Sequence, residues 1–427
     1  MTDETYLVLR VPRPRHDESF DDPTPQPFSV TRGTRDGGGT LGIDSPAPPA
    51  YRIERETLSG RDYRALSRDP EVQAMAPPIP IRLIRPVALA SDGPGPGPHD
   101  PAGATWGLAA TGALSSPYTG RGIRVAVLDT GIDPDHAAFQ DPDLELIQQD
   151  FTGEGNGDRD GHGTHVAATL FGRAVGGRRV GVAPGVSRAL IGKVIGQGAS
   201  ADTGTLLRAI QWATDGGAQV VNLSLGIDFP GLVQRCTQQG MAAELATSRA
   251  LEAYRETLRL FDALATLIAA QVQAQSRTGR GPGALLVAAA GNESRRDQQP
   301  DYRIAVSPPA SADGFLSVGA LGTAGPPYDR LSIAPFSNYR PQVCAPGVGI
   351  VSAQAGGGLV RMSGTSMASP HVAGLAALWA ERAQVQSGAV RIVTLRAQVE
   401  GLAARARLEP GADCADVGAG LVGAPQD

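Results

Sequence analysis

The N-terminal part of the chain alternates between apolar and polar positions in short stretches. These stretches predict strands at residues 6–11, 51–58, 72–76 and 81–84 and a short helix at 59–67. Residues 12–50 are instead crowded with Pro, Gly and Asp and show no apolar period, which predicts loop or disorder. A small α+β unit is therefore expected within residues 1–87.

Residues 88–105 form a second break in the pattern. The repeated Gly-Pro pairs at 93–98 cannot contribute to an apolar core. We expect an extended linker here that proteases can reach. It would separate the N-terminal domain from a larger domain at 106–427.

From residue 106 onward, apolar runs bounded by glycine alternate with helical segments. The runs are residues 123–128, 189–195, 220–225 and 284–290. Apolar strands that alternate with helices predict an α/β fold with a mostly parallel sheet between helices. Chemistry in such sheets gathers at the carboxyl ends of the strands. Asp129 follows the first of these runs, and Asn292 lies just after the last.

Three glycine-rich blocks carry an Asp, a His and a Ser in that chain order. They are VLDTG at 127–131, GHGTHVA at 161–167 and SGTSMASPH at 363–371. A serine hydroxyl is a weak nucleophile until an imidazole takes its proton, and the imidazole needs a carboxylate to fix its tautomer. The helix-forming run after Ser366 would place that residue at a helix N-terminus, which favours a developing oxyanion.

The three blocks resemble those of the subtilisin family of serine proteases, and the resemblance covers about residues 106–425. It implies a subtilisin-like three-layer fold with a mostly parallel sheet. It also implies a serine endopeptidase that forms an acyl-enzyme on Ser366, with His162 as general base and Asp129 orienting the histidine. No cofactor is expected for catalysis.

A fourth block at residues 288–292 resembles the family segment whose asparagine donates to the oxyanion. Asn292 and Ser366 would then form the oxyanion hole. The resemblance also implies two kinds of substrate-binding segment. The specificity pocket would be lined by Ser224, Leu225, Gly226, Ala289, Ala290 and Gly291, and the edge that pairs with an extended substrate would be Gly198, Ala199, Ser200 and Ala201.

The N-terminal domain resembles an abbreviated inhibitory propeptide of this family, especially at residues 69–77. Where relatives have a first helix, this chain has the Pro-rich stretch. The resemblance implies that the domain is an intramolecular inhibitor or chaperone. The protease would then be a zymogen that is regulated or autoprocessed through its N-terminal domain.

Two features raise the question of a metal ion. In many relatives the loop after the histidine block binds calcium, but residues 171–180 here offer Arg173, Arg178 and Arg179 and no acid or amide, so we expect no ion there. Structural calcium elsewhere stays open. His165, together with His162 and Asp160, could also form a metal site, although the match to the protease block favours a structural His165.

The connection from Gly226 to Gly291 is longer than is usual in the family. Apolar residues recur in it every three or four positions, which predicts a long amphipathic helix. These residues are Leu251, Tyr254, Leu258, Phe261, Leu264, Ile268 and Val272. We expect the helix to pack on the sheet, and the loop at 227–241 is placed to shape substrate access.

Composition limits the classes of partner that we expect for this chain. The net charge of -5, from 38 Lys and Arg against 43 Asp and Glu, gives no general attraction to polyanions, so no nucleic-acid partner is expected. We see no signal peptide and no stretch long enough to cross a membrane, which favours a cytoplasmic protein acting on peptides or proteins. Cys236, Cys344 and Cys414 are too scattered for a disulfide framework and are expected to be buried free thiols.

Three rival classes make different predictions. An inactive peptide-binding module would have a broken triad, whereas all three residues are present here. A metal-dependent hydrolase would be inhibited by chelators and would resist serine-directed reagents. A scaffold protein would keep its cellular role after Ser366→Ala.

Overall fold

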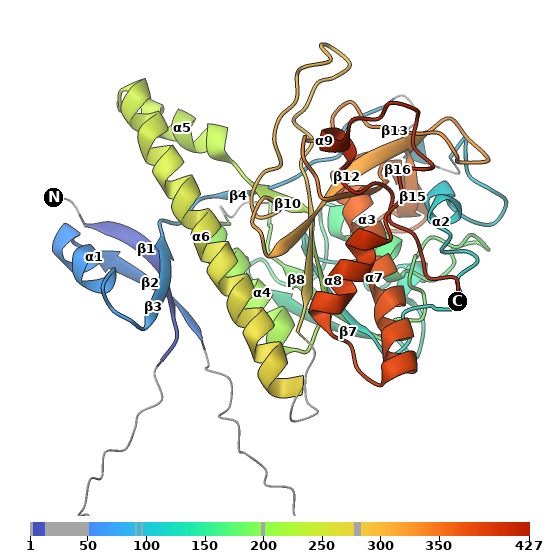
Figure 1. Cartoon of the computed structure of the whole chain (residues 1–427), viewed down its shortest axis with the longest axis horizontal. Helices are drawn as coiled ribbons and strands as arrows, with labels where there is room; N and C mark the ends of the chain where they lie inside the picture. Colours follow the sequence, from blue (N-terminus) through green and yellow to red (C-terminus); the bar gives the residue numbers. More distant parts are fainter. Residues whose placement is uncertain (1–2, 13–50, 90–91, 95–96, 198–200, 277–282) are drawn as a thin grey trace, which may run out of the picture.

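The computed structural model describes residues 3–12, 51–89, 92–94, 97–197, 201–276 and 283–427 (Figure 1). Residues 13–50, predicted as loop or disorder, lie outside the described residues, as do Gly198, Ala199 and Ser200. Among the helices of the described residues, none has the length and apolar character needed to cross a membrane.

The larger domain is built on an eight-stranded sheet. Its strands are β6 (Arg124–Asp129), β7 (Glu145–Asp150), β8 (Arg188–Lys193), β9 (Val220–Leu223), β11 (Leu285–Ala289), β12 (Phe315–Thr323), β13 (Leu331–Ile333) and β14 (Val343–Pro346). Their order is β13-β12-β11-β9-β6-β8-β7, with β14 also paired to β12. All the pairs are parallel except β12 with β13. The predicted mostly parallel sheet is confirmed.

Helices cover both faces of this sheet (Figure 1). The longer helices are α3 (His162–Phe171), α4 (Thr203–Asp215), α5 (Phe229–Gln238), α6 (Ala243–Ser276), α7 (Thr365–Ser387) and α8 (Ile392–Gly401). The short ones are α2 (Trp106–Ala110), η1 (Ala137–Phe139) and α9 (Cys414–Val417). Successive strand residues point to opposite faces. Val125 and Val127 therefore pack in the apolar cluster that contains α3 and α7, and Ala126 and Leu128 in the cluster that contains α4 and α6.

The N-terminal domain is a three-stranded antiparallel sheet with one helix. Its strands β1 (Glu4–Arg10), β2 (Arg52–Leu58) and β3 (Val72–Ala76) have the order β2-β1-β3, and α1 (Gly60–Leu66) follows β2. The side chain of Ser59 accepts from the amide of Asp62 and starts α1 with a capping box. These elements were predicted from the apolar pattern.

This small sheet shares an apolar core with the larger domain. Leu7 and Leu9 of β1 are fully buried in the same cluster as Leu207 of α4 and Phe261 of α6. At the edge of the interface, the Tyr63 hydroxyl donates to the Glu256 carboxylate at 3.0 Å. The sheet lies on the outer side of α6 in Figure 1. The N-terminal domain is therefore docked by apolar packing, with polar contacts at the rim.

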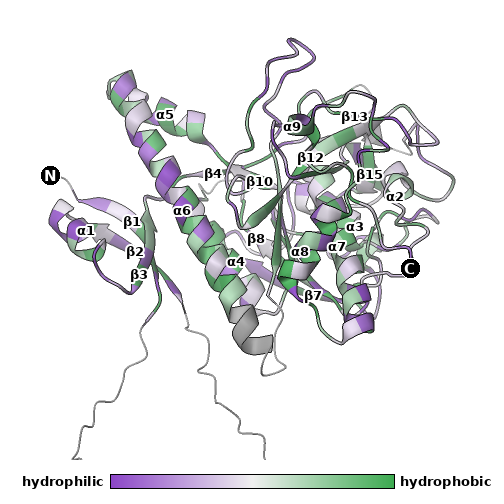
Figure 2. Ribbon diagram, viewed as in Figure 1, coloured by the Kyte–Doolittle hydropathy of each residue, from purple (hydrophilic) through white to green (hydrophobic). Residues whose placement is uncertain are grey.

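The connection between β9 and β11 is mostly helical. Residues 227–241 were predicted as a loop, whereas most of them form α5, which begins at the cap Asp228 with Pro230 in its first turn. Both features favour a helix start. Figure 2 shows that hydrophobic and hydrophilic residues alternate around α6, and Phe261 packs edge-on against Phe315 of β12 at 5.6 Å between ring centres. The predicted amphipathic helix is present and packs on the sheet.

Several described residues after Arg85 are bonded to the larger domain. Strand β5 (Gly93–Pro94) pairs with β16 (Leu359–Met362), which in turn pairs with β15 (Ile350–Ala353). The Val87 amide donates to the Ser363 carbonyl at 2.8 Å, and the Ser363 hydroxyl to Asp92 at 2.8 Å. Composition predicted an extended linker and gave no sign of these bonds. The domain boundaries themselves stay predictions.

The three cysteines are free, but their burial differs from the prediction. Cys344 is buried, Cys236 is half-buried and Cys414 is exposed, so the expectation of three buried thiols is wrong for the last two. Cys414 starts the short surface helix α9.

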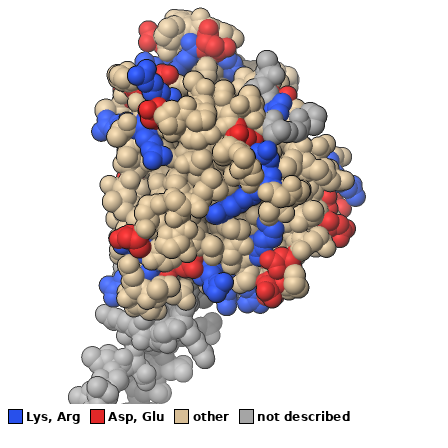
Figure 3. Space-filling view, turned by 90° about the vertical axis from the view of Figure 1, so that its right-hand side faces the viewer, with Lys and Arg blue, Asp and Glu red and all other residues tan. Residues whose placement is uncertain are grey.

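On the face shown in Figure 3, basic and acidic side chains lie interspersed on a largely uncharged surface.

If α6 is part of the core, two identical substitutions along it should have unequal effects. Leu264 is fully buried, so Leu264→Ala should lower the free energy of unfolding by about 2–5 kcal/mol. Leu251 is exposed, and Leu251→Ala should change it by about 0.5 kcal/mol or less. Urea unfolding followed by circular dichroism measures both, and equal effects would place the helix outside the core.

Candidate active site

Ser366 lies in the first turn of α7 and is fully buried. Its hydroxyl donates to the main-chain carbonyl of Ile84, at 2.8 Å. The helix that begins here runs for 23 residues, so its aligned peptide dipoles place partial positive charge beside Ser366. The site thus favours negative charge next to this hydroxyl.

Asp129 and His162 meet at the carboxyl end of β6. The His162 Nδ1 atom lies 2.7 Å from the Asp129 Oδ1 atom, which also accepts from the Thr130 amide at 2.8 Å. The lack of a side chain on Gly163 permits this approach, because a Cβ there would come within 2.2 Å of the Gly131 carbonyl oxygen. The glycine-rich blocks therefore bring the turn after β6 against the first turn of α3.

The environment of His162 sets its protonation. Burial alone would lower the pKa of His162, but the charge and hydrogen bond of Asp129 outweigh burial and raise it above its ordinary value. Among the described residues, His162 Nε2 has no hydrogen-bond partner, since the Ser366 hydroxyl donates to Ile84 instead. The structure thus joins Asp129 to His162 by a hydrogen bond and packs α3, which carries His162, against α7, which carries Ser366. His162 and Ser366 themselves share no hydrogen bond.

Asn292 follows β11, and its side-chain amide has a fixed orientation. The Oδ1 atom accepts from both the amide and the hydroxyl of Thr365, at 2.9 and 2.8 Å. The Nδ2 atom donates to the carbonyl of Arg85 at 2.9 Å. Since Thr365 precedes Ser366, these bonds hold the amide donor of Asn292 beside the serine.

Residues 80–85 of the chain itself occupy the predicted substrate cleft. Strand β4 (Ile81–Leu83) pairs antiparallel with β10 (Leu225–Ile227), with Leu83 opposite Leu225 and Arg82 opposite Gly226. On the other side, the Ile81 amide donates to the Ala201 carbonyl at 2.9 Å. The cleft therefore holds an extended segment between two edges, and residues 80–85 are called the cleft strand below.

The predicted pocket residues lie around the end of this strand. The Ser224 carbonyl accepts from the Ile84 amide at 3.4 Å. Ala289 and Ala290 are fully buried at the end of β11, and the Gly291 amide donates to the Thr365 hydroxyl at 3.1 Å. The structure thus places Ser224, Leu225, Gly226 and Ala201 against the cleft strand, with residues 289–291 leading into Asn292.

Sequence reasoning missed the place of the cleft strand. It identified a strand at 81–84 but assigned it to the N-terminal unit, whereas β4 pairs only with β10 among the described strands. One signal was available: Pro80 precedes this short stretch and Pro86 follows soon after it, and proline has no amide hydrogen for a ladder. A short strand between two prolines is a poor member of a small sheet.

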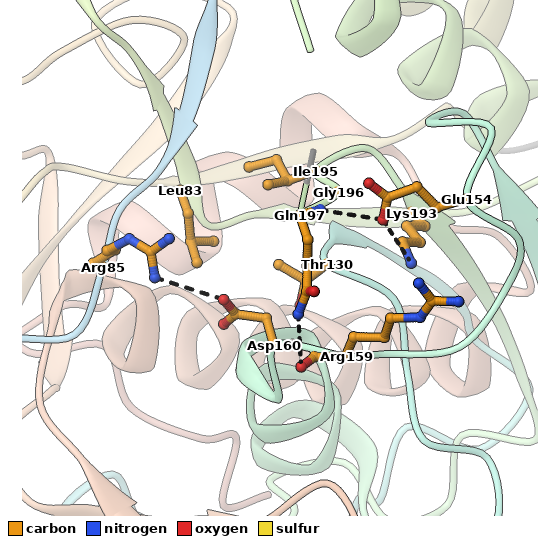
Figure 4. A pocket seen from close by; sticks show the side chains of 10 residues that line it. All are labelled: Leu83, Arg85, Thr130, Glu154, Arg159, Asp160, Lys193, Ile195, Gly196 and Gln197. Atoms are coloured by element: carbon orange, nitrogen blue, oxygen red, sulfur yellow. Dashed lines mark hydrogen bonds and ion pairs between the residues drawn. The ribbon is translucent and has the colours of Figure 1, made fainter. Parts of the chain in front are cut away.

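A charged pocket opens beside Arg85 (Figure 4). Arg85 lies 3.6 Å from Asp160, and Lys193 lies 3.6 Å from Glu154 across the pocket. Because Arg85 is largely exposed, its ion pair is screened by solvent. The pocket lies along the cleft strand, because its lining includes Leu83 and Arg85, on either side of the residue whose carbonyl Ser366 contacts.

The structure gives His165 a different environment from the hypothetical metal site. His165 is fully buried, its Nε2 atom lies 3.0 Å from the Ile350 carbonyl, and burial lowers its pKa to about 3. Within the described ranges, no three His, Cys, Asp or Glu side chains are grouped so as to hold a metal. In the loop after α3, Arg173 pairs with Asp141 and Arg178 with Asp100.

Comparisons with known proteins agree with this geometry. The sequence model of the subtilase family, Peptidase_S8, matches residues 120–408. The chain is 30% identical over 331 residues to a "Thermostable alkaline protease" of Halalkalibacterium halodurans, covering 75% of this chain and 70% of that protein. It is 32% identical over 272 residues to an "Intracellular serine protease" of Paenibacillus polymyxa, covering 61% and 67%.

A solved structure gives the same fold. The crystal structure of a cold adapted subtilisin-like serine proteinase superposes with a TM-score of 0.54 at 24% identity, covering 76% of this chain and all of that one. The family match, the related proteases and this fold lead to one conclusion. The chain belongs to the subtilase family and is a subtilisin-like serine endopeptidase.

Proposed function

We propose that Ser366 is the nucleophile of this endopeptidase, His162 its general base and Asp129 the group that orients the histidine. The serine oxygen attacks the scissile carbonyl carbon while His162 Nε2 takes its proton. The proton then passes to the leaving amine, and water releases the acyl group by the same steps in reverse order. Asn292 Nδ2 and the amide of Ser366 stabilise the oxyanion.

One observation carries this proposal. The nucleophile candidate and the oxyanion donor both bind main-chain carbonyls of one extended segment, through Ser366 to Ile84 at 2.8 Å and Asn292 to Arg85 at 2.9 Å. An extended peptide is the form in which a protease binds its substrate. The polar groups of the site are thus directed at a peptide backbone.

The same contacts support inhibition by the cleft strand. For attack, the serine oxygen must face a carbonyl carbon whose oxygen receives the Asn292 donor. Here the two donors go to successive carbonyls, those of Ile84 and Arg85, and the Ser366 proton is directed at Ile84 rather than at His162. The strand fills the cleft without presenting either bond for hydrolysis.

The N-terminal domain would act as the anchor of this inhibitor. Apolar packing against α4 and α6 holds the sheet in place, and the Thr203 amide binds the Ile79 carbonyl at 2.9 Å just before the cleft strand begins. Regulation then consists of displacing a tethered competitor, whose local concentration at the cleft is set by its attachment to the same chain. Autoprocessing in the region after the cleft strand is part of the same proposal.

Catalysis by these residues needs no cofactor, because the nucleophile, the base and the oxyanion donor are all groups of the chain. A cytoplasmic location belongs to the proposal as well. It is supported by the related protease named "Intracellular" and by three free cysteines, which reducing compartments maintain.

Ser366→Ala should abolish peptide hydrolysis and labelling by a fluorophosphonate, while circular dichroism stays unchanged. A chelator should leave the wild-type rate intact, since no metal takes part in the steps above. Mass spectrometry of the two proteins tests autoprocessing, because an N-terminal fragment should form only in the wild type. Hydrolysis at the wild-type rate by the alanine variant would refute the assignment.

Hydrolysis should rise with pH through the titration of His162, which must be neutral to act as base. Since Asp129 raises the pKa of His162, the midpoint of kcat/KM should lie above about 6.5, the ordinary value. Asp129→Asn should move this midpoint down and lower kcat by about 10⁴-fold. Asp329→Asn, a change on the exposed surface, is the control, and a profile flat from pH 5 to 9 would contradict the role of His162.

Ile81→Asp should open the cleft. Ile81 is buried in the apolar cluster. A carboxylate at this position should weaken the binding of the cleft strand in the cleft by at least the burial energy of the side chain, about 1.5–3 kcal/mol. Fluorophosphonate labelling of Ser366 should accelerate at least about tenfold. Val393→Asp, on an exposed side chain of α8, should leave the rate unchanged. Equal labelling of all three proteins would show that the strand does not inhibit.

A further inference from the structure

Two carboxylates enclose the side chain of Arg82 in the cleft strand. One guanidinium nitrogen lies 2.7 Å from Glu293 Oε1, and the other lies 3.3 Å from Asp228 Oδ1. Glu293 directly follows Asn292, and Asp228 directly follows β10. These two acids, called the acid clamp below, therefore rise from the two segments that also form the predicted oxyanion hole and pocket wall.

Contacts that do not involve Arg82 hold each carboxylate in place. Asp228 caps α5 and accepts from the Gly231 amide at 3.1 Å. The Glu293 Oε2 atom accepts from Asn338 Nδ2 at 2.7 Å, and Asn338 is fully buried and accepts in turn from the Glu293 amide. The acid clamp is thus preorganised by the fold, so it exists for any strand in the cleft.

The register fixes which substrate residue meets the clamp. Arg82 is paired with Gly226 and lies two residues before Ile84, whose carbonyl contacts the Ser366 hydroxyl. A substrate that pairs with β10 in this register places the third residue before its scissile bond between Asp228 and Glu293. Side chains alternate along a strand, so this residue points away from the side taken by its two neighbours.

We propose that the acid clamp selects substrates with a basic residue, Arg before Lys, at the third position before the scissile bond. The inference rests on the proposed function of Ser366 and adds a substrate class to it. A planar guanidinium can bridge two carboxylates, whereas a lysine ammonium is a single point. Because Asp228 starts the helical connection to β11, that long segment contributes directly to substrate choice.

The size of the preference follows from solvent exposure. Arg82 is 42% exposed and the two acids are 24% and 32% exposed, so both pairs are screened by water. Two such pairs give a preference of about 2- to 30-fold over a neutral residue of the same shape. The preference should shrink as ionic strength rises.

Competition between two peptides in one tube with the full chain tests this. Both have the sequence of residues 79–85 followed by two alanines, and they differ only in arginine or citrulline at the position of Arg82. The ratio of their rates gives the ratio of kcat/KM whatever fraction of clefts is open. Mass spectrometry should find cleavage after the Ile84 position and faster loss of the arginine peptide, by about 2- to 30-fold.

The double variant Asp228→Asn, Glu293→Gln should bring this ratio to about one, with citrulline-peptide cleavage retained, since asparagine still caps a helix. The control Asp329→Asn, Glu409→Gln removes the same charge from exposed positions and should leave the ratio unchanged. The inference is overturned, and the proposed function is not, if the ratio of the two rates is near one in the wild type. The same holds if the double variant has the ratio of the wild type. Absence of both cleavage and fluorophosphonate labelling in the wild type and in the Ile81→Asp variant overturns the proposed function and this inference with it.

A second measurement tests the inference if the cleft of the full chain admits the fluorophosphonate but no peptide. Arg82→Gln in the full chain should accelerate fluorophosphonate labelling by the same factor, because the cleft strand loses its two ion pairs. In the Asp228→Asn, Glu293→Gln background the same substitution should have no further effect. Additive effects of the two changes would mean that the clamp does not recognise the basic side chain, which overturns the inference.

Discussion

The contact between the turn after β6 and the first turn of α3 is the constraint on which the rest of the site depends. Asp129 and His162 can share a 2.7 Å hydrogen bond because Gly163, without a side chain, lets the start of α3 contact the backbone at Gly131. Any side chain at Gly163 would push α3 outward, and α3 packs on α7, which carries Ser366. One backbone approach thus positions groups from three separate blocks of sequence.

A second constraint is that the amides and carbonyls of an extended backbone need hydrogen-bond partners on both sides. The cleft offers such partners along β10 and at Ala201, and the chain satisfies them with its own residues 80–85. This arrangement explains the chemistry of the resting site. The Ser366 hydroxyl and the Asn292 side-chain amide, proposed as nucleophile and oxyanion donor, instead bind two successive carbonyls of a strand that belongs to the same chain.

Sequence patterns predicted most of the frame, for identifiable reasons. The apolar runs of β6, β8, β9 and β11 are long enough to require burial on both faces, and Asp129 and Asn292 stand where such strands end. The partner of β4 could not be predicted, because alternation along 81–83 is the same whichever strand it pairs with, and β10 lies far away in sequence. The helix α5 was missed because Pro230 and Gly231 at its start are typical of a loop, and because none of its residues is buried.

The bonds that follow the cleft strand bear on what a cut in the chain would achieve. Val87 is held by Ser363, and β5 by β16, so the residues after Arg85 are fastened to the larger domain independently of those before it. A break just after the cleft strand would leave both new ends held beside Ser366. Each end would then stay at a high local concentration relative to the other. Under the proposed inhibition, the lifetime of the blocked cleft would then depend on how fast the small sheet unbinds from α4 and α6, and a cut would make that departure permanent.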